Sequence, residues 1–269
     1  MLNLLRADMY RVLRGKGIYI TFIVLLIVNI FVSGVFQAAQ SGAIEFGSEE
    51  ATAAIVAELG DSGMTGAEMP ALLSSSMDNV IWFMLAVIMI VAAVIFSDKT
   101  VKNDISFGVC RIKLYLSKLI LCAVFCFIIM AFYIASGVLI GTVLSGFGGP
   151  LPSGYWSNLV QVFFAQYFMM LGVTSVGVFL VFTLKSYGAA LGSYFAFFLI
   201  PMVIVQLLVF ARPSLEWLAN YDLPSSLNLL ANIQNMETGA IVRAFSIGGF
   251  YLVVVTILGI VLFRRAEIK

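Results

Sequence analysis

Residues 119–144 read LILCAVFCFIIMAFYIASGVLIGTVL, a run that contains no Asp, Glu, Lys or Arg. An α-helix needs about 20 consecutive apolar residues to cross the ~30 Å hydrocarbon core of a bilayer. Five other runs are similarly apolar and uncharged, at residues 18–39, 80–96, 159–184, 187–210 and 244–263. None alternates polar and apolar residues as the strands of a membrane barrel do. The sequence therefore predicts an all-α integral membrane protein, a single transmembrane domain of residues 1–269 with six spans.

The composition excludes several other classes of protein. Of the 269 residues, 62% are hydrophobic and only 11% are charged, against about 25% charged in a typical soluble domain. Soluble enzymes and nucleic-acid-binding proteins are therefore excluded. The chain has no His, and its three Cys residues form no CxxC pair, so the sequence indicates neither a metal site nor a disulfide framework.

The distribution of positive charge predicts the orientation of the chain. Six spans put both termini on one side, and cytoplasmic segments carry an excess of Lys and Arg. With the N-terminus and the C-terminus inside, segments 40–76 and 211–243 are extracellular loops, and only Arg212 and Arg243 of the 15 basic residues lie outside. The 13 basic residues on the cytoplasmic side are Arg6, Arg11, Arg14, Lys16, Lys99, Lys102, Arg111, Lys113, Lys118, Lys185, Arg264, Arg265 and Lys269.

Residues 1–17 are expected to form an amphipathic elbow helix that lies in the cytoplasmic interface. At 100° per residue, one arc carries apolar side chains that include Leu5 and Met9, and the opposite arc carries Arg6, Arg11 and Arg14. Two roles remain open for this helix: an anchor that sets the topology, or a docking element for a partner.

The cytoplasmic segment 97–118 between the second and third spans carries the most specific pattern. From Thr100 to Lys118 it reads TVKNDISFGVCRIKLYLSK. Although it is rich in charge, it contains Val101, Ile105 and Phe107, which need something to bury against. The apolar side chains indicate a contact surface rather than a solvated linker.

This segment, the elbow helix and the six spans together resemble the permease subunits of ABC-2 type transporters, also grouped as type V ABC exporters. The matching residues in the segment are Thr100, Lys102, Asn103, Ser106, Phe107, Gly108, Arg111, Lys113, Tyr115 and Lys118. Many members carry an acidic residue and a Gly directly before the Thr, where this chain has Asp98 and Lys99. The resemblance implies a coupling helix here, with ATPase contacts drawn from Asp98, Thr100, Lys102, Asn103, Asp104, Ile105, Phe107, Gly108 and Arg111.

The energy source is expected on another subunit. The only Gly-Lys pair, Gly15-Lys16, lacks the phosphate-binding pattern G-x-x-x-x-G-K-[ST]. The six runs also contain no Asp, Glu, Lys, Arg or His that could bind a coupling ion. The chain is therefore not expected to be an enzyme or to bind a cofactor directly. The exclusion of other energy sources and the family resemblance together predict two copies of a separate ATPase subunit that binds ATP-Mg. They also predict a second permease subunit, identical or different. The complex is expected in the bacterial cytoplasmic membrane.

The polar residues inside the spans leave the transport pathway open. Asn29, Gln161, Gln166 and Gln206 either hydrogen-bond neighbouring helices or contact cargo. Uncharged spans favour export of a hydrophobic or amphipathic peptide or drug, as relatives of this size do. The alternative is a membrane sensor or immunity protein that binds a peptide or a partner subunit without transporting it.

Overall fold

The fold is all-helical and contains six helices that are long and apolar enough to cross a membrane, which confirms the predicted fold class. A computed structural model describes residues 2–40, 65–97, 100–149, 153–212, 223–228 and 238–266. Asp98 and most of segment 40–76 lie outside the described residues. The long helices are α2 (Lys16–Gln40), α8 (Arg111–Ser145), α9 (Tyr155–Leu184), α10 (Tyr187–Ala211), α12 (Thr238–Arg265), and a composite span formed by α5 (Asn79–Ile88), η1 (Met89–Ala93) and α6 (Val94–Ser97).

Four shorter helices lie at the ends of the bundle. The amphipathic helix α1 (Leu2–Arg14) precedes the first span, and α7 (Thr100–Ser106) lies in the predicted coupling segment. Two others, α4 (Met69–Ser75) and α11 (Leu223–Asn228), lie at the opposite end. Helix α1 ends at Arg14, before the limit of residue 17 expected from the sequence, because Gly15 separates it from α2, which begins at Lys16.

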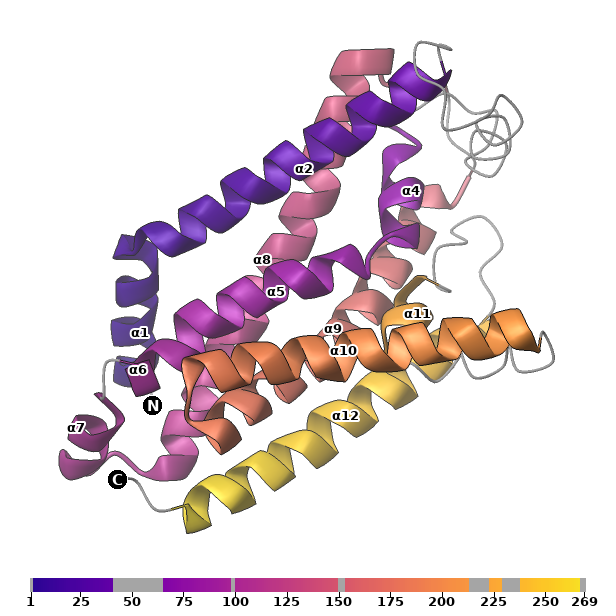
Figure 1. The fold of residues 1–269 in the computed structure, drawn as a ribbon. Helices are drawn as coiled ribbons and strands as arrows, with labels where there is room; N and C mark the ends of the chain where they lie inside the picture. Colours follow the sequence, from indigo (N-terminus) through magenta and orange to yellow (C-terminus); the bar gives the residue numbers. More distant parts are fainter. Residues whose placement is uncertain are drawn as a thin grey trace.

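The core lies between the composite span, α8 and α9, whose most apolar stretches are half buried or more. Helix α12 packs mainly along α9, and α2 packs mainly along α8. In α10 and α12 only 11% of the most apolar stretch is buried within the chain. Figure 1 shows α2 and α12 on opposite sides of the bundle, with both chain ends at the end that carries α1 and α7. We call this the terminal end.

Helices α8 and α12 extend furthest beyond the apolar runs that the sequence marks. Helix α8 begins at Arg111 rather than at residue 119, and α12 begins at Thr238, so Arg243 lies within a helix rather than in the loop assigned to 211–243. The physical reason is that hydropathy marks only the part of a helix that hydrocarbon surrounds. Charged turns of the same helix continue past that limit.

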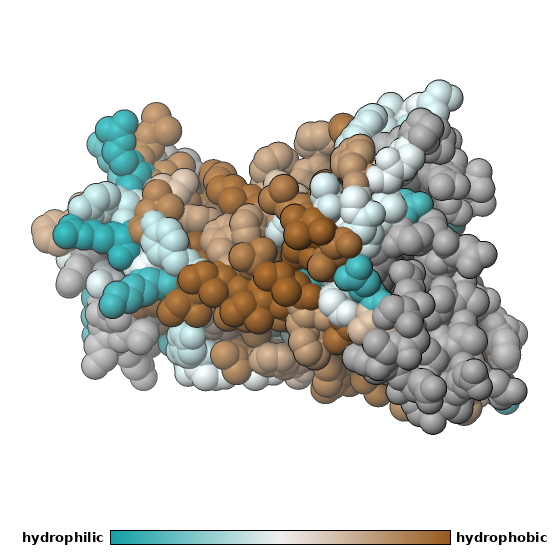
Figure 2. Space-filling model, turned by 90° about the horizontal axis from the view of Figure 1, so that it is seen from above, coloured by the Kyte–Doolittle hydropathy of each residue, from teal (hydrophilic) through white to brown (hydrophobic). Residues whose placement is uncertain are grey.

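The composite span contains a π-helical segment, η1. A π turn bonds each N–H to a carbonyl five residues back, which changes the alignment of side chains and carbonyls relative to an α-helix. The start of α2 contacts this segment, because a Cβ at Gly17 would lie 3.0 Å from the Ile90 side chain. Seen from above, hydrophobic residues form a broad band across the molecule and hydrophilic residues gather at the terminal end (Figure 2).

Candidate functional site

Helix α7 is held against the bundle by its apolar side chains. Val101 is buried and Ile105 is half-buried against the core. At the start of the helix, the Thr100 hydroxyl donates a hydrogen bond to the Ile95 carbonyl of α6 at 3.4 Å. Two of the three apolar residues that the sequence singled out are thus covered within the chain itself.

Two side chains at α7 are exposed. Phe107 is 86% exposed directly after the helix, and the Lys102 side chain is also exposed. The helix ends at Gly108, whose φ of +83° is a conformation that side chains disfavour, and whose N–H bonds the Ile105 carbonyl at 3.0 Å. Asn103 and Asp104 lie on α7, but their side chains lie outside the described part of the chain.

Arg111 binds within the chain rather than pointing away from it. Its Nη1 donates to the carbonyls of Phe263 at 3.3 Å, Arg264 at 2.9 Å and Ala266 at 2.7 Å. These carbonyls end α12, where the helix dipole is negative and a guanidinium is stabilising. The residue that the family resemblance assigned to ATPase coupling therefore joins the start of α8 to the C-terminal end of α12.

Cys110 occupies the residue directly before α8 and is exposed. Hydrogen bonds from the backbone N–H groups of Ile112 and Lys113 lower the pKa of its thiol below the ordinary value. Such donors stabilise a thiolate at a helix N-terminus. Cys122 and Cys126 are both buried, so Cys110 is the exposed thiol of this part of the chain.

A buried ion pair joins the elbow helix α1 to α8. The Lys118 Nζ donates to Asp8 Oδ1 at 2.5 Å, with side-chain exposures of only 1% for Lys118 and 9% for Asp8. Sequence reasoning missed this pair, although a signal existed. Asp8 follows Leu5 by three residues and precedes Val12 by four, so it shares their face of the helix.

The same helix contacts the π-helical segment. Arg11 Nη2 lies 3.7 Å from Asp8 Oδ1 and donates to the Val91 carbonyl of η1 at 3.3 Å. Val12 is buried beside them. Charge, rather than apolar burial alone, therefore fixes α1 simultaneously to α8 and to the middle of the composite span.

The remaining elbow residues follow the predicted amphipathic pattern only in part. Leu5 and Met9 are half-buried against the core, and Arg6 and Arg14 are exposed. Arg14 donates to the Tyr10 hydroxyl at 2.8 Å on the exposed face.

The four polar residues that the sequence placed in the spans divide into two pairs. The Asn29 amide nitrogen of α2 donates to Ser136 Oγ at 2.7 Å and to the Tyr133 carbonyl at 3.2 Å, both in α8. The Gln166 amide nitrogen of α9 donates to the Ser74 carbonyl at 2.8 Å and the Leu227 carbonyl at 3.0 Å, which joins α9 to α4 and α11. Gln161 and Gln206 are exposed.

Comparison with known proteins finds a family match over most of these elements. Residues 4–203 match the family described as ABC-2 family transporter protein. The matched stretch includes α1, α7, Arg111 and the Asp8–Lys118 pair. A search of curated proteins finds no match.

Proposed function

Because the chain belongs to the ABC-2 transporter family and is a multi-pass permease component, we propose that its terminal end faces the cytoplasm and binds a separate ATPase. The observation that carries this proposal is helix α7, which is seated through Val101 and leaves Phe107 86% exposed. An exposed aromatic at the tip of a well-packed helix is a typical anchor for a partner's pocket. Lys102 beside it adds a charge that water reaches in the free subunit.

Permease subunits of this family have no ATPase activity of their own. The proposed complex therefore contains two ATPase copies, which bind ATP-Mg, and two permease subunits, identical or different. Lipid and the second permease cover the apolar surface of α10 and α12, of which little is buried within the chain.

The contacts at the terminal end give a route for movement. Closure of the ATPases on ATP pushes on α7, which adjoins α6 through Thr100 and Ile95. Movement of the composite span then reaches α1 through Arg11 and the Val91 carbonyl. Packed helices transmit such a push as a rigid-body shift between the two permease halves.

The proposed cargo is a hydrophobic or amphipathic peptide or drug that is exported across the bacterial cytoplasmic membrane. The six apolar runs contain no Asp, Glu, Lys or Arg to bind a charged solute. A cargo that enters from the membrane needs no such group, because its apolar part already lies in hydrocarbon.

Reconstitution with the ATPase in proteoliposomes tests the proposal. We expect hydrophobic peptides to stimulate ATP hydrolysis and to accumulate on the side opposite the ATPase. Peptide binding without stimulated hydrolysis or accumulation would instead identify a sensor or immunity protein. Failure of the chain to bind any ATPase through α7 would contradict the proposal.

A further inference from the structure

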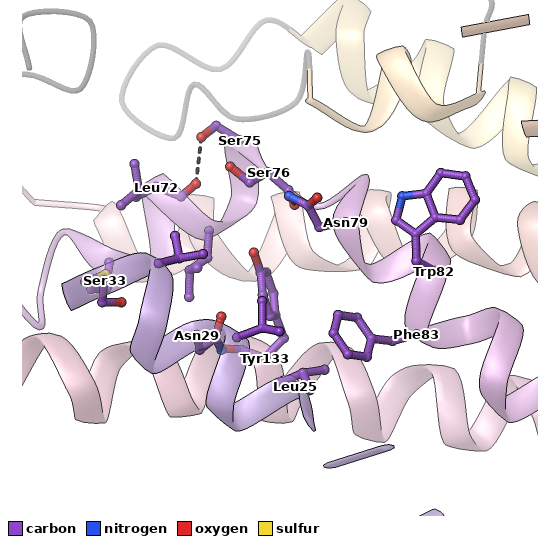
Figure 3. Close-up of a pocket in the computed structure, with 14 residues that line it drawn as sticks. Leu25, Asn29, Ser33, Leu72, Ser75, Ser76, Asn79, Trp82, Phe83 and Tyr133 are labelled. Atoms are coloured by element: carbon purple, nitrogen blue, oxygen red, sulfur yellow. Dashed lines mark hydrogen bonds between the residues drawn. The ribbon is translucent and has the colours of Figure 1, made fainter. Parts of the chain in front are cut away.

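A cavity of about 490 Å³ lies between α2, α4, the α4–α5 turn, α5 and α8. Figure 3 shows Leu25 and Phe83 at one end of the cavity and Ser33 with Ser75 toward the other. Its volume falls in the range of about 300–1,000 Å³ that is typical of small-ligand sites. The described lining residues all belong to this one chain. None of them lies in α7 or in the elbow helix α1, so the cavity is separate from the contacts described above.

Three nearly buried side chains present unused polar atoms around this cavity. Asn29 is 3% exposed, Ser33 is 4% exposed and Tyr133 is 6% exposed. The Asn29 amide nitrogen is used twice, but its Oδ1 accepts no hydrogen bond from the described residues. The Ser33 and Tyr133 hydroxyls make no hydrogen bond to the described residues, and neither is among the fully enclosed polar atoms, so both open onto the cavity.

The orientation of Tyr133 makes its hydroxyl part of the site. In Figure 3 its ring stands in the middle of the cavity, with the oxygen toward the α4–α5 turn, and Asn29 lies beside it. Polar atoms that open onto a cavity and bond no protein group are the groups that orient a ligand in a small-molecule site. Several unpaired groups around one cavity therefore indicate a ligand that supplies both a donor and an acceptor.

The lining also restricts the charge and shape of that ligand. Among the described residues, the lining contains no Asp, Glu, Lys or Arg, and its polar groups are hydroxyls and amides. The apolar residues Leu25, Val28 and Phe83 continue the cavity away from these groups. An anionic headgroup would lose hydration without gaining a counter-ion, and it would meet the charge of Asp78, which precedes α5 and acts on the Tyr133 hydroxyl. A neutral headgroup satisfies the free hydroxyls without that repulsion.

We propose that this cavity binds an uncharged amphiphile with one hydrocarbon chain and a hydroxyl or amide headgroup, such as a monoacylglycerol. Its headgroup bonds Asn29 Oδ1 and the Tyr133 hydroxyl, and its chain lies along Leu25 and Phe83. The site lies in the outer leaflet if the terminal end is cytoplasmic, which is the one part of this inference that rests on the proposed function.

The test uses the full chain in nanodiscs without an ATPase, and a monoacylglycerol with a diazirine in its acyl chain. We expect saturable photolabelling of α2, α5 or α8 next to the cavity. Unlabelled monoacylglycerol should compete, and a fatty acid of equal length, which is an anion, should compete poorly.

Matched variants separate the site from the fold. Tyr133→Phe removes only the hydroxyl and leaves the backbone carbonyl that binds Asn29, so binding should weaken roughly twofold to tenfold, the value of one hydrogen bond. Tyr115→Phe is the control, because that hydroxyl is also buried without a partner among the described residues but lies outside the cavity. Ser33→Phe fills the cavity and should abolish saturable labelling in protein that still elutes as a folded species.

Equal labelling of the Tyr133→Phe and Tyr115→Phe variants, or labelling that does not saturate, would overturn the proposal. Addition of the ATPase and ATP then distinguishes two sources of the ligand. A probe that stays bound during ATP turnover identifies a resident membrane lipid, and a probe that leaves identifies transported cargo; both support the site. Binding is measured without the ATPase, so a failed ATPase pairing would leave this result unchanged.

Discussion

Replacement of Lys118 by Met should release the elbow helix α1 from the bundle. Lys118 lies 2.5 Å from Asp8, and the two side chains are 1% and 9% exposed. Removal of one partner from a buried ion pair costs about 3–5 kcal/mol, because the other charge stays buried without compensation. Arg11 remains 3.7 Å from Asp8, so we expect the lower end, about 3 kcal/mol.

This loss is large relative to the other contacts of α1. Val12 is the one fully buried apolar residue of that helix, and full burial of such a side chain contributes about 1.5–3 kcal/mol. A penalty of about 3 kcal/mol raises the undocked population of α1 roughly a hundredfold, since each 1.4 kcal/mol is a factor of ten. The rest of the bundle should remain folded, because its core lies between other helices.

Thiol accessibility measures the undocking directly. Val12→Cys in a Cys110→Ser background places a thiol at a position that is 2% exposed. A hydrophilic maleimide should label it about a hundredfold faster once Lys118→Met is added. Arg6→Met is the matched control, because it removes an exposed charge from the same helix, and it should leave the labelling rate unchanged.

The double variant Asp8→Leu with Lys118→Met tests the electrostatic reasoning. Both charges are then absent, and apolar replacement of a buried pair is often nearly neutral, so labelling should return to within about tenfold of the parent. Labelling of the Lys118→Met variant at the parent rate would refute the assignment of α1 docking to this pair. Rapid labelling of the double variant would show that packing at position 118, rather than charge, holds α1.

Three further predictions concern other parts of the molecule. Phe107→Ala should uncouple ATP hydrolysis from transport without loss of folded protein, because the ring is 86% exposed. Phe147→Ala is the control, because this exposed ring lies just beyond the C-terminal end of α8. Normal coupled transport in the Phe107 variant would contradict the coupling role. Gln166→Leu should lower the free energy of unfolding by about 1–3 kcal/mol in denaturation measurements, because two buried carbonyls lose their donor. Gln161→Leu, at an exposed site, should change the free energy of unfolding by no more than about 0.5 kcal/mol. Equal stabilities of the two variants would refute this prediction. Cys110 should still be alkylated at pH values where free cysteine no longer reacts, because its lowered pKa increases the thiolate fraction at any given pH. If the terminal end is cytoplasmic, an impermeant reagent should reach Cys110 only in inside-out vesicles.

The sequence alone determined the class of fold and the position of each span. Six uncharged apolar runs leave few alternatives, because hydrocarbon offers no hydrogen-bond partners and only helices satisfy their own backbone. The amphipathic pattern located α1, and the family resemblance implied a helix within segment 97–118, where α7 lies. Hydropathy placed the start of α8 and α12 too far along the chain, because charged helical turns outside hydrocarbon look like loop residues.

The tertiary structure decided which polar residues meet. Asp8 and Lys118 are 110 positions apart, and no local pattern in the chain links them. Asn29 and Gln166 resemble Gln161 and Gln206 in sequence, since each is an amide with an apolar or aromatic residue on both sides. Only packing shows that the first two bond neighbouring helices and the last two face outward.

Arg111 and the cavity illustrate the same division. Sequence pattern assigned Arg111 to a partner, but the C-terminal carbonyls of α12 lie within reach of its guanidinium. The cavity beside Tyr133 has no sequence signature, because its lining comes from four separate helices and the turn between two of them. Hydropathy along the chain fixes which segments enter the membrane, whereas pairwise side-chain contacts depend on how the helices rotate and cross, which only the packed structure specifies.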